Sequence, residues 1–576
     1  MDSSWSRFKY SWLHGDIVAN TAKVISVIIV LSVAVPIIYV VYGAYESGIP
    51  GQAGSHLTTE WQDQVYGSGA YLSALTWSIV LGVVTATTAT VIGGAFAWLL
   101  TRVEVPLRSL WQGVLLAGFA LPPILATMAW TSLLAPNSGF INIWYNDITG
   151  RGNLIPLYSF ATIAFVMTCV FVPLGYLLTA GAFSAVDISE EEAARTHGFS
   201  IRATLWHVTL RAVRRSMLVT WVLIFSISGQ TFAVVVLLGA PANVQTIPEL
   251  MYQGVTTGQI PLGLVTMLGT LLFWPALIAF VLLLFVQRKG DAVRVQPSLR
   301  EGRWSLGRYH GPVLVVFGLY LAISTLLPFA VLMLDSFLKY QTGHLTRSLF
   351  TLGNYTTALQ DPDVLRALEN TALLGVIVAT VVVLLSFVVA YLQVSAPGSA
   401  AARFVEIVTA FPLALPRLGL SLGILWVTDS VPVLHRWTGS LILIAGSMIL
   451  VNVGLGTRAL SADMAQLPRG YVEAAKLAGM GSVDRAVRII APQLRVTLVE
   501  TWRTVLILAF LEIDLVVFLY TPQSETLSIA TLLDLSQGLS NTAYPLAVMQ
   551  VALVACALVI SGAIRGWMRR SSRRWA

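Results

Sequence analysis

Long apolar segments separated by short polar intervals run along the whole chain. A helix needs about 20 apolar residues to cross the hydrocarbon of a bilayer, and twelve segments reach that length. A transmembrane barrel would instead require many ten-residue segments of alternating polarity. The predicted spans are roughly 24–45, 71–100, 109–134, 158–182, 217–239, 261–287, 311–335, 369–394, 404–428, 437–457, 497–520 and 543–564.

The charge of the polar intervals indicates the orientation of the spans. Intervals 46–70, 240–260 and 521–541 contain acidic residues and no Lys or Arg. In contrast, 288–308 contains five Arg and one Lys, and the tail after residue 564 contains five Arg. Positively charged loops stay in the cytoplasm, so we expect both termini and the central linker to be cytoplasmic.

These features predict an all-α membrane protein with twelve transmembrane helices, arranged as two parallel six-helix halves. The first half covers 1–287, a cytoplasmic linker covers 288–310, and the second half covers 311–576. The halves are parallel because each begins and ends on the cytoplasmic side. We expect a multi-pass protein of the inner or plasma membrane.

Composition supports this class and excludes others. The chain is 56% hydrophobic and 11% charged, whereas soluble domains are about 25% charged. The net charge of +7 is spread over short loops and tails, which indicates contact with membrane lipid and no nucleic acid. Cys169 and Cys556 both lie in apolar segments and resemble small hydrophobic residues. We expect no cofactor, no metal and no catalytic residue.

One polar stretch occurs twice, as EEAARTHGFS at 191–200 and VEAAKLAGMG at 472–481. Each copy contains Glu-Ala-Ala, three residues and Gly, and the copies are 281 residues apart because 473 − 192 = 281. Glu and Ala favour a helix, and Gly permits a tight turn. Each copy therefore predicts a short helix, a turn and a second helix at the cytoplasmic surface, just before the fifth span of its half.

The pattern resembles the Glu-Ala-Ala loop of ABC importer permeases, in which Glu-Ala-Ala, three residues, Gly, nine residues and Ile-x-x-Pro follow one another. The second copy fits throughout, with Ile489 and Pro492 at its end, whereas Val208 and Arg211 replace Ile and Pro in the first copy. The resemblance implies a type I ABC importer permease fold and loops that act as coupling helices. The implied ATPase-coupling residues are Glu192, Ala193, Ala194, Gly198, Glu473, Ala474, Ala475, Gly479 and Pro492.

The resemblance also implies the partners. They are two ATP-binding ABC subunits on the cytoplasmic side and an external substrate-binding protein. The chain contains no Gly-x-x-x-x-Gly-Lys-Ser/Thr loop to hold phosphates. We therefore expect a transport subunit and not an enzyme, with ATP hydrolysed by a separate chain.

Fused twelve-span permeases of this kind are similar to the ferric-iron and thiamine branch of these importers. Residues 511–532 resemble a stretch of ferric-iron permeases that begins Glu-Leu-Pro, although Ile513 and Asp514 replace Leu-Pro here. Residues 232–241 are more similar to the thiamine side. The resemblance implies a binding-protein-dependent importer of ferric iron. The alternative substrates are thiamine and other small solutes such as a polyamine or a phosphonate.

Charged side chains inside spans indicate functional positions because they are costly in lipid. Arg417 lies in the ninth span, and Glu512 and Asp514 lie in the eleventh. Counted from the inner ends of their spans, Arg417 and Glu512 lie at similar depths of about 20 and 23 Å. Arg417 can therefore form an intramembrane pair with an acid of the eleventh span, or these groups can line the transport pathway.

Two other classes are compatible with parts of the pattern. A twelve-span secondary transporter also has two six-span halves, but it places several acids along its pathway and has no use for matched docking loops. A membrane-embedded transferase would require clustered acids or metal ligands at one membrane face. The seven histidines are instead scattered along the chain.

The orientation predicts which loops can be labelled from outside. Cys introduced in place of Gln52 or Gln523, in the acidic intervals 46–70 and 521–541, should react with an impermeant maleimide added to intact cells. Reaction only after permeabilisation would contradict the predicted orientation.

Overall fold

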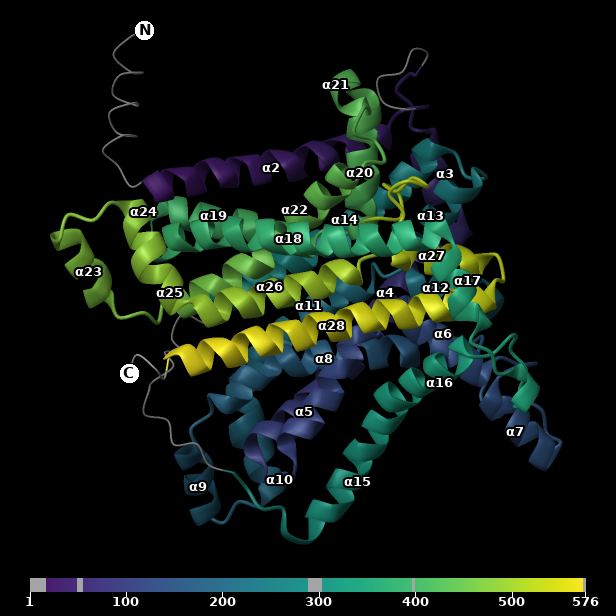
Figure 1. Ribbon diagram of the computed structural model, residues 1–576, viewed down its shortest axis with the longest axis horizontal. Helices are drawn as coiled ribbons and strands as arrows, with labels where there is room; N and C mark the ends of the chain where they lie inside the picture. The colour runs from purple at the N-terminus through teal and green to yellow at the C-terminus, as the bar shows by residue number, and fades with distance from the viewer. Residues whose placement is uncertain (1–16, 49–54, 289–302, 396–398, 573–576) are drawn as a thin grey trace. The chain divides into compact units, whose positions relative to one another are not determined.

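The computed structural model describes residues 17–48, 55–288, 303–395 and 399–572, and Figure 1 shows that these residues are almost entirely helical. Among them there is no β-strand, only two isolated β-bridges. The structure thus confirms the all-α class. In lipid every backbone N–H and C=O group must be paired within the protein, and a helix pairs them within one segment.

Eight helical runs are long and apolar enough to cross a membrane, and they coincide with eight predicted spans. The runs are Asn20–Gly43, Gly69–Arg102, Phe160–Ser184, Leu262–Leu282, Gly307–Ser336, Pro362–Val394, Leu441–Met464 and Ser540–Met568. The chain is therefore a multi-pass membrane protein.

The other four predicted spans contain breaks. Spans 109–134 and 217–239 correspond to helix pairs bent by 97° and 69°. Span 404–428 is divided between two shorter helices, and in span 497–520 the helix ends at Phe510 and turns follow. By length and composition the described residues hold eight spans, or ten if each bent pair is one span. The number twelve stays a prediction.

The helices form two compact units. Unit 1 comprises 1–56, 361–530 and 549–576, and unit 2 comprises 57–360 and 531–548. In unit 2 the helices are α3 (Glu60–Gly67), α4 (Gly69–Arg102), α5 (Arg108–Ala117), α6 (Pro123–Leu134), α7 (Phe140–Thr149), α8 (Phe160–Ser184), α9 (Ile188–Thr196), α10 (Ile201–Thr204), α11 (Leu210–Ser228), α12 (Ala233–Ala242), α13 (Ile247–Thr257), α14 (Leu262–Arg288), α15 (His310–Leu321), α16 (Leu327–Ser336) and α17 (Gly353–Gln360).

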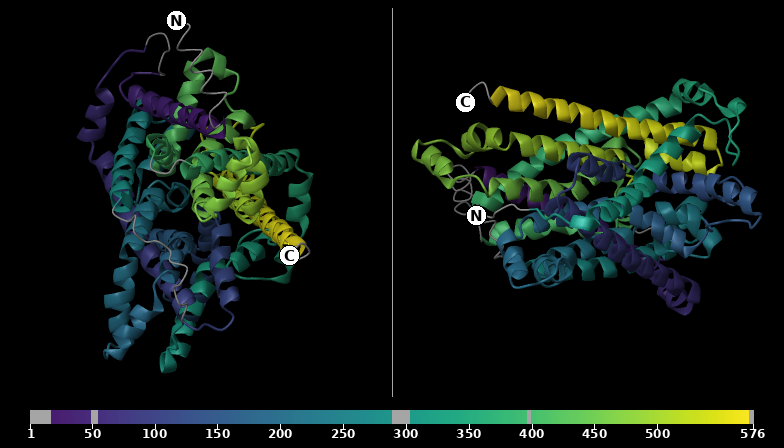
Figure 2. Two further views of the ribbon diagram at one scale, coloured as in Figure 1. Left: turned by 90° about the vertical axis from the view of Figure 1, so that its left-hand side faces the viewer. Right: turned by 90° about the horizontal axis from the view of Figure 1, so that it is seen from below.

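In unit 1 the helices are α2 (Ile17–Gly43), α18 (Pro362–Ser395), α19 (Ala400–Ala410), α20 (Arg417–Ser430), α21 (Pro432–His435), α22 (Leu441–Met464), α23 (Arg469–Leu477), α24 (Ser482–Asp484), α25 (Ala491–Gln493) and α26 (Arg495–Phe510). Helices α27 (Leu527–Ser536) and α28 (Ser540–Ser572) are divided between the units. Figure 2 shows α28 as one long continuous helix.

Each unit includes helices from the other predicted half of the chain. Helix α2, the first described helix of the chain, packs in unit 1 against α18 and α20, which belong to the predicted second half. Helix α16, from the first span of that second half, packs in unit 2 against α6. The boundaries 1–287 and 311–576 stay a prediction about how the repeat divides the sequence. Residues 289–302 of the predicted linker 288–310 lie outside the described residues.

Several helices recur in the same order in the two halves, although α12 of the first half is replaced by turns after Phe510 in the second. Helices α4 and α18 both have 34 residues and are offset by 293, because 362 − 69 = 293. Helices α9 and α23 both have nine residues and are offset by 281, because 469 − 188 = 281. Single contacts repeat with these offsets: the indole nitrogen of Trp221 donates to Thr87 Oγ1 at 2.9 Å, and that of Trp502 donates to Thr380 Oγ1 at 3.1 Å.

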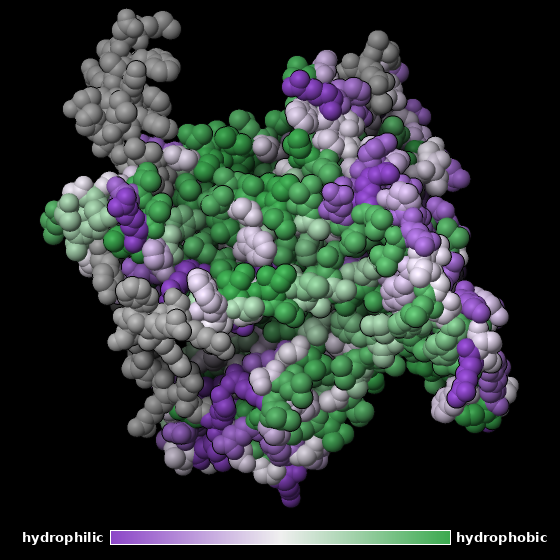
Figure 3. Space-filling view, in the orientation of Figure 1, coloured by the Kyte–Doolittle hydropathy of each residue, from purple (hydrophilic) through white to green (hydrophobic). Residues whose placement is uncertain are grey.

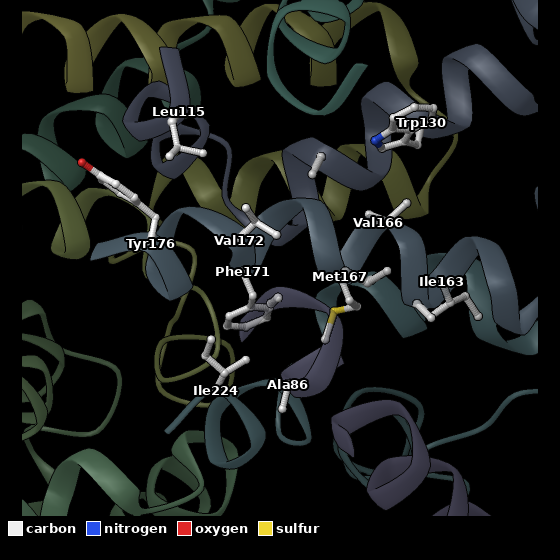
Figure 4. Close-up of a cluster of buried hydrophobic side chains, with 14 of the residues drawn as sticks. Ala86, Leu115, Trp130, Ile163, Val166, Met167, Phe171, Val172, Tyr176 and Ile224 are labelled. Carbon is white, nitrogen blue, oxygen red and sulfur yellow. The ribbon is translucent and has the colours of Figure 1, made fainter. Parts of the chain in front are cut away.

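The core of unit 2 lies between α4 and α8, where the two helices approach closely. Figure 4 shows Met167 and Phe171 of α8 directed toward Ala86 of α4 and Ile224 of α11. The approach is close because glycines face each other: a Cβ added to Gly175 would lie 2.5 Å from the carbonyl oxygen of Ala89. Small residues at a helix contact let backbones pack tightly where lipid supplies no hydrophobic driving force.

Unit 1 presents apolar side chains on its outer surface. On the face seen in Figure 3, hydrophobic residues cover the surface over α2, α18 and α19. Exposed apolar side chains of α2 include Val24, Val27, Ile28, Leu31 and Ile38. This surface is suited to contact with lipid, as expected for helices that cross a membrane.

The glycine contact predicts a specific loss of stability. Gly175→Ala should lower the free energy of unfolding by roughly 1–3 kcal/mol, because the new Cβ meets backbone atoms and not a movable side chain. The matched control is Gly181→Ala in the same helix, where a Cβ meets nothing within 4 Å. Thermal unfolding of the two purified variants in detergent is the measurement, and equal midpoints would contradict the predicted contact.

Candidate functional site

The first Glu-Ala-Ala loop begins with a capped helix. Asp187 is the N-cap of α9, and its side chain accepts a hydrogen bond from the backbone N–H of Ser189 at 2.9 Å. Glu192, Ala193 and Ala194 lie on α9. A carboxylate at a helix N-terminus satisfies free N–H groups and complements the helix dipole, so the polar residues before the motif set where α9 begins.

The glycine of each motif ends its helix in the same way. Gly198 has φ +87° and Gly479 has φ +76°, the left-handed region that favours glycine. In the first copy the N–H of Phe199 donates to the carbonyl of Ala194 at 3.1 Å, and in the second Met480 donates to Ala475 at 3.0 Å. These hydrogen bonds are those of a Schellman cap. They explain why three residues separate the last Ala from Gly.

The motif residues lie mostly on the surface. Side chains or backbone are exposed at Glu192, Ala193, Gly198, Glu473, Ala474, Gly479 and Pro492, whereas Ala194 is half-buried and Ala475 is buried. In Figure 1, α9 lies beside α10, and α23 lies beyond the ends of α18 and α26. The two motifs are therefore short exposed helices with fixed ends, which is the form a docking element requires.

The segment after each turn differs from the predicted second short helix. In the first copy it runs without interruption as Ile201–Ser228 into the following span. It passes through a π-helical turn, Leu205–Thr209, and the second copy has a π-helical turn at Arg485–Ile490. Such turns occur at functional positions. The second copy has Pro492 just after its turn, and Arg211 stands at the equivalent position of the first.

The charged residues of the ninth and eleventh predicted spans meet where both helices are interrupted. Arg417 is the first residue of α20, directly after Pro416, and Glu512 follows the end of α26. Arg417 Nη1 forms an ion pair with Glu512 Oε2. The side chain of Arg417 is 29% exposed and that of Glu512 is 3% exposed, so Glu512 depends on this partner more than Arg417 does.

Two further contacts complete this charged group. Glu512 Oε1 accepts a hydrogen bond from the backbone N–H of Leu515 at 3.1 Å. Asp514 lies beside the pair, and its Oδ1 has no hydrogen-bond partner among the described residues. Two carboxylates and one guanidinium therefore lie together at broken helices.

Near the predicted inner surface, Glu500 joins two helices. It pairs with Arg503 one turn later on α26, as the i, i+3 spacing suggests, and its Oε1 accepts from Arg565 of α28 at 2.7 Å. The spacing along the sequence indicates the pair of Glu500 and Arg503, but it does not indicate the pair of Glu500 and Arg565. The described residues contain no group of three or more His, Cys, Asp or Glu that could hold a metal ion.

Comparisons with known proteins find relatives among permease proteins. No protein-family model matches the chain. It is 23% identical over 475 residues to "Ferric transport system permease protein FbpB" of Actinobacillus pleuropneumoniae, covering 80% of this chain and 66% of that protein. It is also 23% identical over 446 residues to "Putative ferric transport system permease protein FbpB 1" of Haemophilus influenzae, covering 75% and 68%.

Two weaker likenesses concern other solutes. "Sulfate transport system permease protein CysW" of Synechocystis is 27% identical over 190 residues, covering 33% of this chain and 63% of that protein. Among solved structures, a bacterial ABC transporter for alginate import has a TM-score of 0.40 at 14% identity, covering 50% of this chain and 98% of that one.

These relatives are permease proteins of transport systems, and this chain is similar to two of them over most of its length. Within that class, the relatives that match over most of its length are ferric transport permeases, about two thirds of whose own length is covered.

The unequal exposure of the ion pair predicts an unequal response to mutation. Arg417→Met should lower the free energy of unfolding by roughly 3 kcal/mol or more, because it leaves Glu512 buried and charged beside Asp514. Glu512→Gln should cost about 1–2 kcal/mol, because the half-buried Arg417 can still reach water. The double variant should be more stable than Arg417→Met alone, and denaturant unfolding of the three variants measures the order. A larger loss for Glu512→Gln than for Arg417→Met would contradict the assignment.

Proposed function

We propose that this chain is the transmembrane subunit of a binding-protein-dependent ABC importer in the cell membrane. Two separate ATP-binding subunits dock on its cytoplasmic side, at the exposed helices α9 and α23. A substrate-binding protein delivers the solute to the external loops. The observation that carries the proposal is the pair of Glu-Ala-Ala helices with the same length and the same glycine cap, in which the Glu and the first Ala are exposed in both copies.

The mechanism follows from two docking helices on one chain. Closure of the ATPase subunits on ATP moves the segments 187–211 and 468–492 that contain the motifs. The helical run that leads into the fifth span begins at Ile201, just after the turn that ends the first docking helix. Movement of that helix is therefore transmitted into the membrane. The two six-span halves then rock, and a pathway between them opens alternately to each side.

The proposed substrate is ferric iron. It is supported by the two ferric transport permeases that match over most of the chain. The group of Glu512, Asp514 and Arg417 carries more acidic than basic side chains, which is compatible with a cationic solute. Sulfate transport permeases match over a third of the chain or less, so an oxyanion is the competing substrate class.

The function is tested by identifying the partners and the solute in turn. A tagged chain is purified from native membranes, the bound ATPase is identified by mass spectrometry, and uptake is measured in cells that lack the chain. Uptake of ⁵⁵Fe(III) restored by the chain supports the proposal. Restored uptake of ³⁵S-sulfate or labelled thiamine with no effect on iron would contradict the substrate.

The coupling role predicts different effects of two neighbouring substitutions. Gly479→Asp should weaken ATPase docking and uncouple hydrolysis from uptake, because the left-handed backbone costs an L-residue about 1 kcal/mol in addition to the changed surface. Gly198→Asp should be milder, because the first motif is the less complete. A pull-down of the ATPase and an uptake assay measure both.

The matched control is Gly481→Asp, two residues away. It adds the same charge, but the residue has φ −62° and precedes a short helix, where Asp is favourable. ATPase binding and uptake should remain close to normal. Full ATPase binding and normal uptake in Gly479→Asp would show that this loop is not the coupling element.

A further inference from the structure

A fully buried glutamate lies directly before the first Glu-Ala-Ala motif. Glu191 is 0% exposed, although it lies on the short surface helix α9. Its Oε2 pairs with Arg102 and accepts from the indole nitrogen of Trp304 at 2.9 Å. Its Oε1 accepts from Thr209 Oγ1 at 2.6 Å. Three donors from three distant positions therefore hold one side chain of α9.

These donors connect α9 to the ends of other elements. Arg102 is the last residue of α4, and its Nη1 also donates to the carbonyl of Val186 at 2.9 Å. Trp304 lies in the predicted linker 288–310, and its backbone N–H donates to the carbonyl of Arg102 at 2.8 Å. The guanidinium of Arg195, on α9, lies 5.0 Å from the centre of the Trp304 ring. Helix α9 is thus held by Glu191, directly before the motif, and by Arg195, within it.

The second half has no equivalent set of residues. With the offset of 293, Arg102 corresponds to Ser395, and with the offset of 281, Glu191 corresponds to Val472. Thr209 corresponds to Ile490, which is 4% exposed and packs in an apolar cluster with Leu460. Neither an ion pair nor a hydrogen-bonded carboxylate can form from these residue types.

We propose that Arg102 and Trp304 are positioning residues that clamp the first docking helix, so that the two ATPase docking points of this chain are mechanically unequal. Helix α9 is fixed to the end of α4 and to the segment that leads into α15 through a buried carboxylate. The loop after α23 is held differently, by Arg485, which donates to the carbonyl of Met480 at 2.7 Å and to Tyr391 Oη at 3.4 Å. A buried ion pair holds one geometry strictly, because any displacement leaves a charge unpaired. The inference rests on the proposed function in assigning α9 and α23 as docking helices.

The clamp has a consequence for how movement travels. Trp304 lies a few residues before α15, the first span of the second half. A movement of the first docking helix is therefore passed to α4 and to α15 through the same buried carboxylate. The second docking helix is connected, through the turn that follows it, to α26 and, through Arg485 and Tyr391, to α18. We expect loss of the clamp to affect only the first docking point.

The clamp is tested by hydrogen–deuterium exchange of the full chain in lipid nanodiscs, without any ATPase. In the unmodified chain the amides of α9 should exchange at least about tenfold more slowly than those of α23, because opening α9 must break hydrogen bonds to a buried charge. Trp304→Phe keeps an aromatic ring, although a smaller one, and removes the indole N–H donor. It should raise exchange in α9 by about tenfold with no change in α23. Thr209→Val should also raise exchange in α9, whereas Thr209→Ser, which keeps the hydroxyl, should leave exchange in α9 slow.

The control is Trp206→Phe, a neighbouring tryptophan that is 69% exposed and should leave exchange unchanged. Equal exchange of α9 and α23 in the unmodified chain, or no effect of Trp304→Phe, would overturn the clamp. Binding of the ATPase is then measured by pull-down. If the ATPase binds the unmodified chain and Trp304→Phe equally well, the clamp does not position a docking point. If it binds neither, the proposed function fails while the exchange result stands.

Discussion

The structure depends on one constraint, that backbone hydrogen-bonding groups inside a bilayer must be satisfied by the protein itself. Unbroken helices meet this requirement alone, but this chain interrupts the same helices in both halves. At the interruptions, neighbouring side chains replace the missing partners. The N–H of Ile247, at the start of α13, donates to Ser78 Oγ, and the N–H of Leu527, at the start of α27, donates to Thr371 Oγ1, both at 2.9 Å. Gln550 similarly donates to the carbonyl of Phe510, where α26 ends, at 2.9 Å.

These repeated hydrogen bonds identify parts of the two halves that have the same structural role. The hydroxyls of Ser78 and Thr371 and the pair formed by Trp221 and Thr87 recur at fixed offsets. The halves diverge where charge is buried. The first half holds a carboxylate against Arg102 beside its docking helix, and the second holds Glu512 against Arg417 at its broken helices. A common scaffold therefore carries two different charged sites, and each is stable only because its partner is close.

Each half of the sequence contributes helices to the compact unit that is built mainly by the other half. Because α16 packs on α6 and α2 packs on α18 and α20, a span of one half is part of the compact unit built by the other. Movement transmitted to either unit thus acts on both halves of the sequence. This is the structural condition for a rocking motion of one chain driven at two points.

The sequence by itself determined the helical class, the position of most spans, and the two matched motifs with their glycine turns. These properties follow from local patterns: the length of apolar segments, the spacing of Glu-Ala-Ala and Gly, and the conformational freedom of glycine. It also placed Arg417 and Glu512 at similar depths, but it left open whether they pair or line a pathway. Only the tertiary structure decided that Arg417 selects Glu512 and not Asp514, that Arg565 joins Glu500, and that Glu191 is buried while its neighbour Glu192 is exposed. Each of these outcomes depends on which distant segment packs against the side chain, because burial and charge pairing are properties of the packed neighbours and leave no periodic signal along the chain.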